Sequence, residues 1–223
     1  MAKGLFVVGT GTDVGKTYVT ALLIKALRAV GKQAAYYKAA MSGNLRDGGR
    51  PIPGDAVYVR DVSGIKQPLQ DMCPYVYERA YSPHLAARIE GNPVELTRAV
   101  DGFTALTAQY DYITVEGSGG IVCPLRCDEQ EIYLTDVIRA LRLPTVLVAD
   151  AGLGAINAVV LTAAYMRSQN LPVQGVIYNR FVPGDPICED NVYMCEELTG
   201  LSAVAKIGLG ETEFPCDPRK FFE

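Results

Sequence analysis

The sequence predicts an α/β fold in which helices flank a doubly wound, mainly parallel sheet. Short apolar segments alternate with longer segments of helical periodicity, as in βαβ units. Several of the apolar segments run directly into glycine-rich loops, which is typical of buried parallel strands. Ligands bind beyond the carboxyl ends of the strands in such sheets, so functional residues are expected in the loops that follow the strands.

Length and composition limit the possible functions. The chain has 223 residues, 49% of them hydrophobic, which suits a single domain over residues 1–223. Its net charge of −4 provides no basic footprint for nucleic acid, so we expect no nucleic-acid partner. The most apolar long stretch, Leu143 to Met166, is interrupted by Asp150, Gly152, Gly154 and Asn157. It therefore predicts no transmembrane helix, and no membrane partner is expected.

The cysteines indicate a reducing compartment. None of the six cysteines forms a C-x-x-C pair and His84 is the one histidine, so a zinc site is not expected. Reduced thiols are usual in cytosolic proteins, and Met1-Ala2-Lys3 leads into a strand without the features of a signal peptide. We therefore expect a cytoplasmic location.

The first half of the chain predicts a βαβ unit followed by a loop and helices. Leu5 to Val8 is a short apolar strand, and apolar residues recur on one helical face from Thr17 to Val30, before Gly31. Later elements are expected as a strand over Gln33 to Ala40, a loop over Met41 to Pro53, and helices from near Asp55, from Ser82-Pro83 and over Val94 to Gln109.

The second half predicts further strands that alternate with helices. Tyr112 to Glu116 is a β-branched, apolar strand that we expect the glycine run Gly117 to Gly120 to end. The remaining predictions are strands over Thr145 to Ala149, Val173 to Tyr178 and, at an edge, Ala203 to Ile207, with helices over Gly154 to Ser168 and Glu189 to Thr199.

The strongest functional signal is Gly9-Thr10-Gly11-Thr12-Asp13-Val14-Gly15-Lys16-Thr17, between a strand and a helix. Backbone N–H groups of this loop and of the helix start favour a bound anion, with Thr12, Asp13, Val14 and Gly15 at the centre of the loop. Lys16 adds a cation for the β- and γ-phosphates, and the Thr17 hydroxyl can reach Mg²⁺. Five residues separate Gly9 from Gly15 instead of the commoner four. The loop predicts binding of a nucleoside triphosphate with Mg²⁺.

Two further side chains follow the second strand. Lys38 and Ser42 stand at its carboxyl end, which places an ammonium group beside the phosphate loop. A solvated surface lysine is an equally good interpretation of this position.

Two carboxylates are candidate metal ligands. Glu116 ends a buried strand, where an unpaired carboxylate would be costly and a nearby Mg²⁺ would compensate it. The glycines after it, including Gly119, would let the backbone approach a ligand closely, although a simple strand-ending turn is an alternative. Asp55 follows Gly54 at an expected helix start, so it is interpreted first as a cap and second as a further metal ligand.

A third loop has the character of an anion site. Gly154, Ala155, Ile156 and Asn157 open a helix directly after a strand, so their free N–H groups could bind a carboxylate. A plain strand-to-helix turn explains the same pattern at least as well.

Taken together, these residues resemble the dethiobiotin synthetase family, which has the P-loop NTPase fold. The resemblance extends from Leu5 to Asn179 and depends on motifs in the family's order. These motifs are the glycine-lysine-threonine loop with five intervening residues, the lysine that ends the second strand, Ser42-Gly43, Ser82-Pro83-His84, Val-Glu-Gly-x-Gly-Gly and Gly-x-Ile-Asn.

The resemblance implies an ATP- and Mg²⁺-dependent ring closure of 7,8-diaminopelargonic acid with CO₂, through a carbamate and a carbamic–phosphoric anhydride. By the same resemblance, Lys16 and Lys38 stabilise anionic oxygens and Ser42 lines the substrate site. Mg²⁺ is organised by Thr17, Asp55 and Glu116, and the nucleotide also contacts Gly119 and Asn179. The helix start from Gly154 to Asn157 holds the substrate's tail carboxylate across a homodimer interface. Ser82-Pro83-His84 is interpreted as a helix start and not as a general base.

Several positions depart from the family's pattern. Asn179-Arg180 stands where Asn-Asp is usual, and arginine offers hydrogen-bond donors only, so we expect looser or different selectivity for the base. The other departures are Gly11 for aspartate, Ala39 for proline, and Ala155 and Ala158 for cysteine and histidine.

The main alternative of a different class is a dimeric partitioning or positioning ATPase that acts as a switch. Those proteins usually carry a second lysine early in the phosphate loop. The early loop here, Thr10 to Asp13, contains none.

Overall fold

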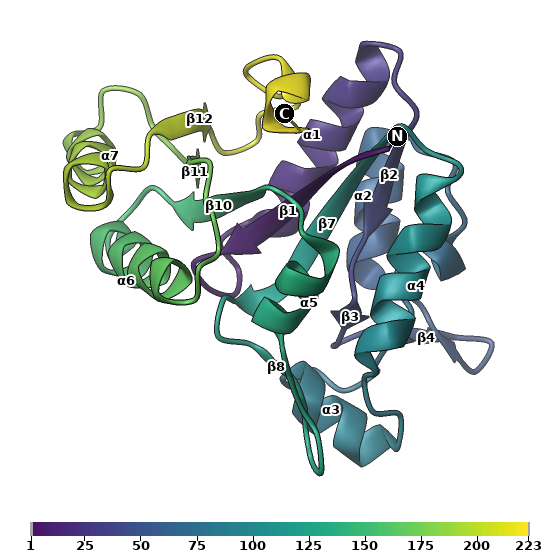
Figure 1. The fold of residues 1–223 in the computed structure, drawn as a ribbon. Helices are drawn as coiled ribbons and strands as arrows, with labels where there is room; N and C mark the ends of the chain where they lie inside the picture. Colours follow the sequence, from purple (N-terminus) through teal and green to yellow (C-terminus); the bar gives the residue numbers. More distant parts are fainter. Residues whose placement is uncertain (1, 223) are drawn as a thin grey trace.

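Six parallel strands form the central sheet of the computed structural model, which describes residues 2–222. The order of the strands across the sheet is β12-β11-β10-β1-β7-β2 (Figure 1). The strands are β1 (Lys3–Gly9), β2 (Ala34–Tyr37), β7 (Tyr112–Gly120), β10 (Thr145–Asp150), β11 (Val176–Asn179) and β12 (Ala203–Ile207). The chain winds to one side of β1 first and to the other side later, so a crevice opens at the carboxyl end of β1. The predicted doubly wound α/β fold is confirmed.

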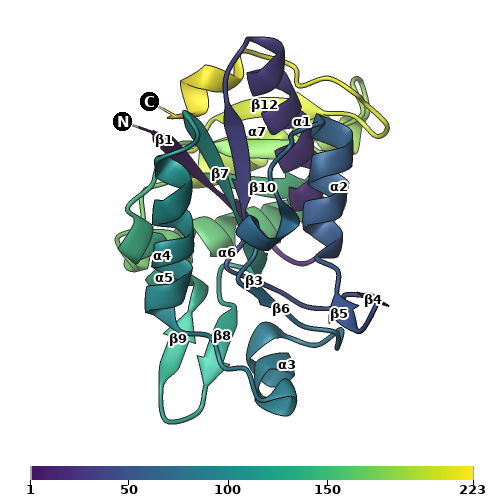
Figure 2. The same ribbon diagram turned by 90° about the vertical axis from the view of Figure 1, so that its right-hand side faces the viewer.

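Helices cover both faces of this sheet (Figure 2). One face packs against α1 (Lys16–Ala29) and α2 (Gly54–Ser63). The other face packs against α4 (Leu96–Thr107), α5 (Leu134–Leu141), α6 (Ala155–Ser168) and α7 (Pro186–Thr199). Each face of the sheet thus has its own hydrophobic core. Strand β1 contributes to both cores, with Leu5 and Val7 in one and Phe6 and Val8 in the other. Burial on both faces explains why this strand is continuously apolar.

Smaller elements lie around the central sheet. α3 (Pro83–Glu90) packs beside β8 (Pro124–Cys127), which forms a hairpin with β9 (Glu131–Tyr133) (Figure 1). The other short elements are β3 (Ala40–Met41) with β6 (Tyr75–Val76), β4 (Arg46–Asp47) with β5 (Arg50–Pro51), and the 3-10 turns η1 (Leu69–Asp71) and η2 (Pro218–Phe222).

Two strand boundaries predicted from the sequence are wrong. β2 ends at Tyr37, because the Lys38 N–H turns away to the carbonyl of Met72 at 2.8 Å and Ala40–Met41 pairs with β6 in a separate sheet. β7 does not stop at Glu116. It continues to Gly120, which pairs with Gly9 after a bulge, because the glycine run stays extended along the end of β1.

The other elements agree with the sequence predictions to within a few residues, apart from segments that were not predicted. The expected loop from Met41 to Pro53 contains the small β4–β5 hairpin, and no prediction covered β8, β9 or α5. Ser82 is the N-cap of α3 as expected, but its hydroxyl makes no capping hydrogen bond.

The outer edge of β2 is covered by a side chain. The amide of Gln67 accepts a hydrogen bond from the Tyr36 N–H at 2.8 Å and donates one to the Tyr36 carbonyl at 2.9 Å. Gln67 therefore takes the place of a neighbouring strand at an edge whose backbone groups would otherwise lack partners.

The end of the chain returns to the α1 face. Phe214, Phe221 and Phe222 are buried there, and the rings of Phe222 and Tyr112 meet edge to face with centroids 5.0 Å apart. The six cysteines are free thiols. Over residues 2–222, none of the helices has the length and apolar character needed to cross a membrane.

Candidate active site

The predicted phosphate loop connects β1 to α1 at the crevice. Gly15 has φ 93°, and a Cβ there would lie 2.0 Å from Asn179 Nδ2, so the position requires glycine for conformation and for space. α1 begins without a side-chain capping hydrogen bond, which leaves the N–H groups of its first turn available to an anion. Lys16 folds back over the loop and donates from Nζ to the carbonyl of Gly11 at 2.8 Å. Burial lowers the pKa of this ammonium below its ordinary value.

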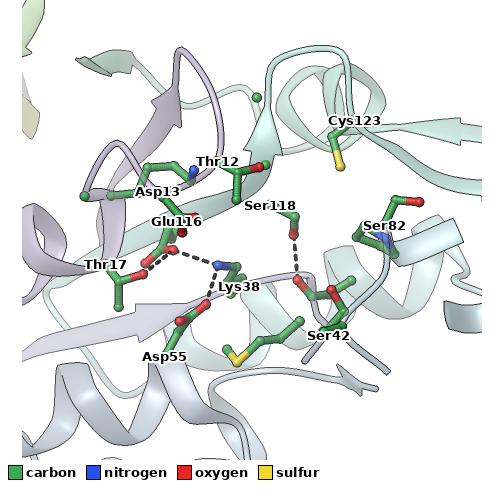
Figure 3. Close-up of a pocket in the computed structure, with 18 of the residues that line it drawn as sticks. Thr12, Asp13, Thr17, Lys38, Ser42, Asp55, Ser82, Glu116, Ser118 and Cys123 are labelled. Carbon is green, nitrogen blue, oxygen red and sulfur yellow. Dashed lines mark hydrogen bonds and ion pairs between the residues drawn. The ribbon is translucent and has the colours of Figure 1, made fainter. Parts of the chain in front are cut away.

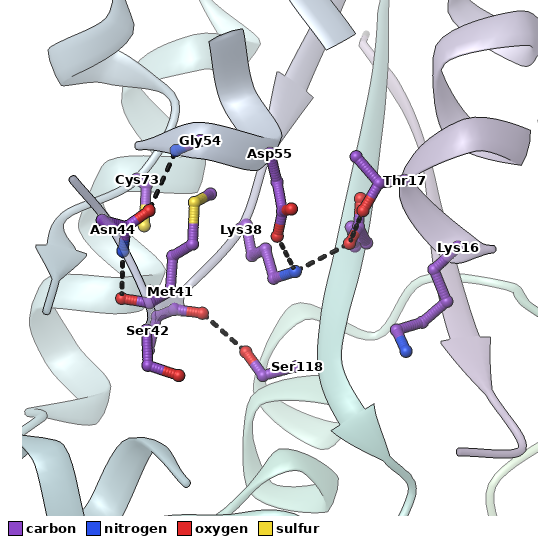
Figure 4. A network of polar contacts seen from close by, with 12 residues as sticks. Lys16, Thr17, Lys38, Met41, Ser42, Asn44, Gly54, Asp55, Cys73 and Ser118 are labelled. Atoms are coloured by element: carbon purple, nitrogen blue, oxygen red, sulfur yellow. Dashed lines mark hydrogen bonds and ion pairs between the residues drawn. The ribbon is translucent and has the colours of Figure 1, made fainter. Parts of the chain in front are cut away.

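Glu116 is the centre of a polar network below the loop. The residue is 1% exposed, and its Oε1 accepts hydrogen bonds from Thr17 Oγ1 at 2.9 Å and from Lys38 Nζ at 2.7 Å (Figure 3). Lys38 Nζ also contacts Asp55 Oδ2 at 2.6 Å (Figure 4). The structure thus brings together Thr17, Lys38, Asp55 and Glu116, of which Lys38 and Asp55 were ambiguous from the residues alone.

The interpretation of Lys38 as a solvated surface residue is wrong. Its side chain is buried between two carboxylates. Burial by itself would lower the pKa of the ammonium, but Glu116 and Asp55 outweigh burial and raise that pKa above its ordinary value. Lys38 therefore keeps its positive charge in this site at neutral pH.

The interpretation of Asp55 as a helix cap is also wrong. The first N–H of α2, that of Gly54, donates to Asn44 Oδ1 at 2.9 Å (Figure 4). Asp55 lies in the first helical turn with its carboxylate directed at Lys38. The side chain is therefore available to a cation in the cleft.

The donor set fits a magnesium ion. Mg²⁺ takes oxygen ligands and is commonly held by one or two carboxylates together with substrate phosphates. Thr17, Asp55 and Glu116 supply one hydroxyl and two carboxylates around a point where Lys38 already holds a positive charge. Over residues 2–222 there is no cluster of three or more His, Cys, Asp and Glu side chains suited to a metal. A metal here would therefore depend on the hydroxyl and on bound phosphate oxygens as well.

A cleft of about 1070 Å³ extends from this network. The predicted residues Thr12, Asp13, Gly15, Lys16, Thr17, Lys38, Ser42, Asp55, Glu116 and Gly119 all line it. On the side away from the phosphate loop the lining includes Ser42, whose hydroxyl donates to the Tyr81 carbonyl at 2.6 Å, and Ser82 (Figure 3). The cleft thus extends from the predicted phosphate loop to a second half lined by Ser42 and Ser82.

Asn179 contacts the phosphate loop at Val14. Asn179 Nδ2 donates to the Val14 carbonyl at 3.0 Å, while Asn179 Oδ1 is buried without a hydrogen-bond partner among residues 2–222. An orphaned buried acceptor at this place fits a ligand that supplies a donor. Arg180 lines the cleft and pairs with Asp150.

The predicted carboxylate site does not reach this cleft. Gly154, Ala155, Ile156 and Asn157 begin α6 but do not line it. Leu153, just before them, is 87% exposed. His84 lies in the first turn of α3 and does not line the cleft either.

Two buried side chains of the site were missed by the sequence interpretation. Tyr36 donates from its hydroxyl to Glu116 Oε2 at 3.0 Å. The sequence offers no separate signal for it, because a tyrosine in a predicted strand is ordinary. Cys123 lines the cleft, and burial raises the pKa of its thiol to about 11. It lies at the β7–β8 connection, for which no element was predicted.

Comparisons with known proteins found a family model and relatives that match most of the chain. A family model described as an AAA domain matches residues 3–210. A protein of Brachyspira hyodysenteriae named ATP-dependent dethiobiotin synthetase BioD is 46% identical over 205 residues, which are 92% of this chain and 91% of that protein. A Clostridium perfringens protein of the same name is 41% identical over 207 residues, which are 93% of this chain and 91% of that protein.

Solved structures show a similar fold at low identity. A ParA family ATPase from Chlorobium tepidum superimposes with a TM-score of 0.60 at 16% identity, covering 95% of this chain and 86% of that one. The MinC:MinD cell division complex of Aquifex aeolicus gives a TM-score of 0.55 at 12% identity, covering 93% of this chain and 81% of that one. Likeness at this identity concerns the fold alone.

Proposed function

Because the chain belongs to the dethiobiotin synthetase family, we propose that its cleft is where 7,8-diaminopelargonic acid, CO₂ and ATP are converted to dethiobiotin, ADP and phosphate. The observation that carries this proposal is the convergence of the phosphate loop, Lys38 and two carboxylates on one wall of a cleft whose other wall includes Ser42. The partitioning ATPase alternative is not favoured, because the similarity to ParA and MinD structures is limited to the fold.

The phosphate loop is proposed to bind the triphosphate. Thr12, Asp13, Val14 and Gly15 would surround the phosphates with backbone N–H groups, and the uncapped start of α1 would add its own. Lys16 would exchange the Gly11 carbonyl for phosphate oxygens. Phosphoryl transfer depends mainly on positioning and charge neutralisation, and this loop can supply both.

Thr17, Asp55 and Glu116 are proposed to hold Mg²⁺ next to the β- and γ-phosphates. When bound, Mg²⁺ would neutralise phosphate charge and orient the γ-phosphate. Lys38, which now bridges Asp55 and Glu116, would then be free to turn toward the other half of the cleft.

In the first chemical step, one amine of the substrate adds to CO₂ and loses a proton to solvent, giving a carbamate. A carbamate oxygen then bonds to the γ-phosphorus as the bond to the ADP oxygen breaks. Lys38 has a raised pKa and stays protonated, so its role is to stabilise the anionic oxygens and not to accept a proton.

In the last step the second amine attacks the carbonyl carbon of the mixed anhydride, loses its proton and expels phosphate as the ring closes. Ser42 is proposed to position the substrate, since its hydroxyl lies on the cleft wall opposite the phosphate loop. Asn179 is proposed to meet the base with its unpartnered Oδ1, and Gly119 to allow close approach of backbone to nucleotide.

A homodimer is proposed as the active form. Gly154 to Asn157 do not line this chain's own cleft, so a substrate carboxylate bound at this helix start would belong to the site of a second subunit. The same helix exposes apolar surface, since Leu153 before it and Leu161 on it are 87% and 62% exposed. A monomer in light scattering that remains fully active would contradict this part of the proposal.

Mass spectrometry tests the reaction directly. The protein is incubated with diaminopelargonate, ATP, Mg²⁺ and isotopically labelled bicarbonate, and dethiobiotin carrying one labelled carbon is expected. ADP formation should depend on diaminopelargonate. ATP hydrolysis at the same rate with and without diaminopelargonate and bicarbonate would instead favour a switch ATPase.

The proposed location of the protein is the cytoplasm, a reducing compartment that suits its six free thiols.

A further inference from the structure

Two side chains at the end of β2 form different hydrogen bonds to the same carboxylate. Tyr36 lies in β2 and Lys38 lies just past its end, and both side chains reach Glu116. Lys38 Nζ contacts Glu116 Oε1 at 2.7 Å, and the Tyr36 hydroxyl donates to Glu116 Oε2 at 3.0 Å. The two oxygens of Glu116 are therefore held by different groups, one charged and facing the cleft, the other neutral and facing the core.

We propose that Tyr36 is a positioning residue for metal binding: its hydroxyl holds Oε2 of Glu116 in the core so that Oε1 stays directed at Thr17 and the cleft. The inference rests on the proposed role of Glu116 as a magnesium ligand. Tyr36 itself touches neither metal nor substrate and acts only through Glu116.

Burial makes this hydrogen bond important. Tyr36 is 0% exposed and Glu116 is 1% exposed, so water cannot replace the tyrosine hydroxyl. A buried carboxylate oxygen without a donor is costly, and Glu116 without Tyr36 would turn to find one.

The tyrosine is itself fixed from outside the cleft. Gln67 bonds both the N–H and the carbonyl of Tyr36, at 2.8 and 2.9 Å. Gln67 is buried and lies in a different part of the chain from every residue assigned to the nucleotide. Tyr36 thus occupies a rigid place behind the site, as partners that orient metal ligands generally do.

The next residue provides a matched control. Tyr37 is also 0% exposed, but it points to the opposite face, where its hydroxyl donates to the Ala99 carbonyl at 2.6 Å. Tyr36→Phe and Tyr37→Phe each remove one buried phenol hydroxyl and one hydrogen bond from adjacent residues of the same strand. Only the first hydrogen bond leads to the proposed metal site.

The test measures Mn²⁺ binding by electron paramagnetic resonance, with a non-hydrolysable ATP analogue present, for wild type and both variants. Loss of a partner that orients a metal ligand typically weakens metal binding by about 10- to 100-fold, so Tyr36→Phe should raise the Mn²⁺ Kd by about tenfold or more. Its kcat should fall while the KM for diaminopelargonate is unchanged. Tyr37→Phe should lower the melting temperature without changing the Mn²⁺ Kd.

The outcomes separate this inference from the proposed function. If wild type binds Mn²⁺ and Tyr36→Phe binds it equally well, Tyr36 has no positioning role. If wild type itself binds no Mn²⁺ with the nucleotide, the metal site fails and the role of Tyr36 fails with it. Should Tyr36→Phe not fold, Gln67→Met, kept dilute and unheated, releases the same tyrosine without touching Glu116. Weaker Mn²⁺ binding is then expected, and unchanged binding would refute the proposal.

Discussion

Arg180 donates a hydrogen bond of 2.8 Å from its guanidinium to the backbone carbonyl of Asp13, and both residues adopt a left-handed backbone conformation with φ of 56° and 60°. That conformation costs about 1–2 kcal/mol for a residue with a side chain. Asp150 pairs with the same guanidinium. The phosphate loop is thus tied to the ends of two neighbouring strands.

This link bears on the choice of nucleotide base. Arg180 is engaged with Asp13 and Asp150, and the Asn179 amide nitrogen with Val14, which leaves Asn179 Oδ1 as an acceptor for the base. Adenine and cytosine each carry an amino group that can donate a hydrogen bond to this oxygen. We expect kcat/KM for ATP, CTP and GTP to lie within about tenfold, or about 1.4 kcal/mol. A preference for ATP of several hundredfold would show that the base is recognised by other contacts.

Lys16→Ala should abolish turnover and leave the fold intact. Lys16 acts on charge that develops on the phosphates, and loss of one such contact typically lowers the rate by about 10²–10³. Steady-state kinetics measures the loss, and a melting curve checks the fold. Lys25→Ala is the control, because Lys25 lies on the same helix but binds Thr212 and Glu213 near the end of the chain. Near-normal turnover in folded Lys16→Ala would refute the role of the loop.

Asp55→Asn should weaken the Mg²⁺ response without weakening α2. The capping acceptor of that helix is Asn44, so the amide variant loses only a carboxylate charge in the cleft. We expect the Mg²⁺ concentration for half-maximal activity to rise by about tenfold, since affinity for hard cations follows the number of charged ligands. Circular dichroism should be unchanged. An identical Mg²⁺ titration would remove Asp55 from the metal site.

Lys38→Met should separate metal binding from catalysis. The ammonium neutralises Asp55 and Glu116, so its removal leaves two carboxylates without their partner cation. We therefore expect tighter Mn²⁺ binding than in wild type, together with turnover lower by about 10²-fold or more, because one stabilising charge is lost from the transition state. Weaker Mn²⁺ binding in this variant would mean that Lys38 helps to hold the metal site together.

Cys123 should resist alkylation at neutral pH although it lines the cleft. The thiolate is the reactive form, and burial raises the pKa of this thiol from 9.0 to about 11. At pH 8 its thiolate fraction is then about a hundredfold below that of an ordinary cysteine. The iodoacetamide labelling rate of the Cys123 peptide should keep rising up to about pH 11. A plateau near pH 9 would contradict the effect of burial.

The central part of the fold could be predicted from sequence because periodicity and loop chemistry agree there. The apolar β1, the glycine loop and the amphipathic α1 each predict the same βαβ unit, and the structure contains it. The end of β7 could not be predicted, because a glycine run usually signals a turn. Here Gly120 instead continues to pair with Gly9, a contact distant in sequence.

The site residues also divide into those that a local motif predicts and those that depend on contacts distant in sequence. Lys16 and Thr17 carry a local motif that needs no knowledge of the fold. The roles of Lys38 and Asp55 were ambiguous from sequence, because they depend on an ion pair across 17 residues of chain. Tyr36 gave no signal of its own, because a tyrosine in a strand is ordinary, and only its placement behind Glu116 distinguishes it.

The amide of Gln67 along the edge of β2 also bears on how the protein behaves at high concentration. Edge strands with free backbone groups act as templates for pairing with another chain. Gln67 forms hydrogen bonds with both the N–H and the carbonyl of Tyr36, the groups that such pairing would need. A variant such as Gln67→Met would uncover them, and intermolecular β-pairing could then begin at β2. The variant should then aggregate on concentration or mild heating, below its global unfolding transition. Gln67 would thus both fix Tyr36 and prevent intermolecular β-pairing at β2.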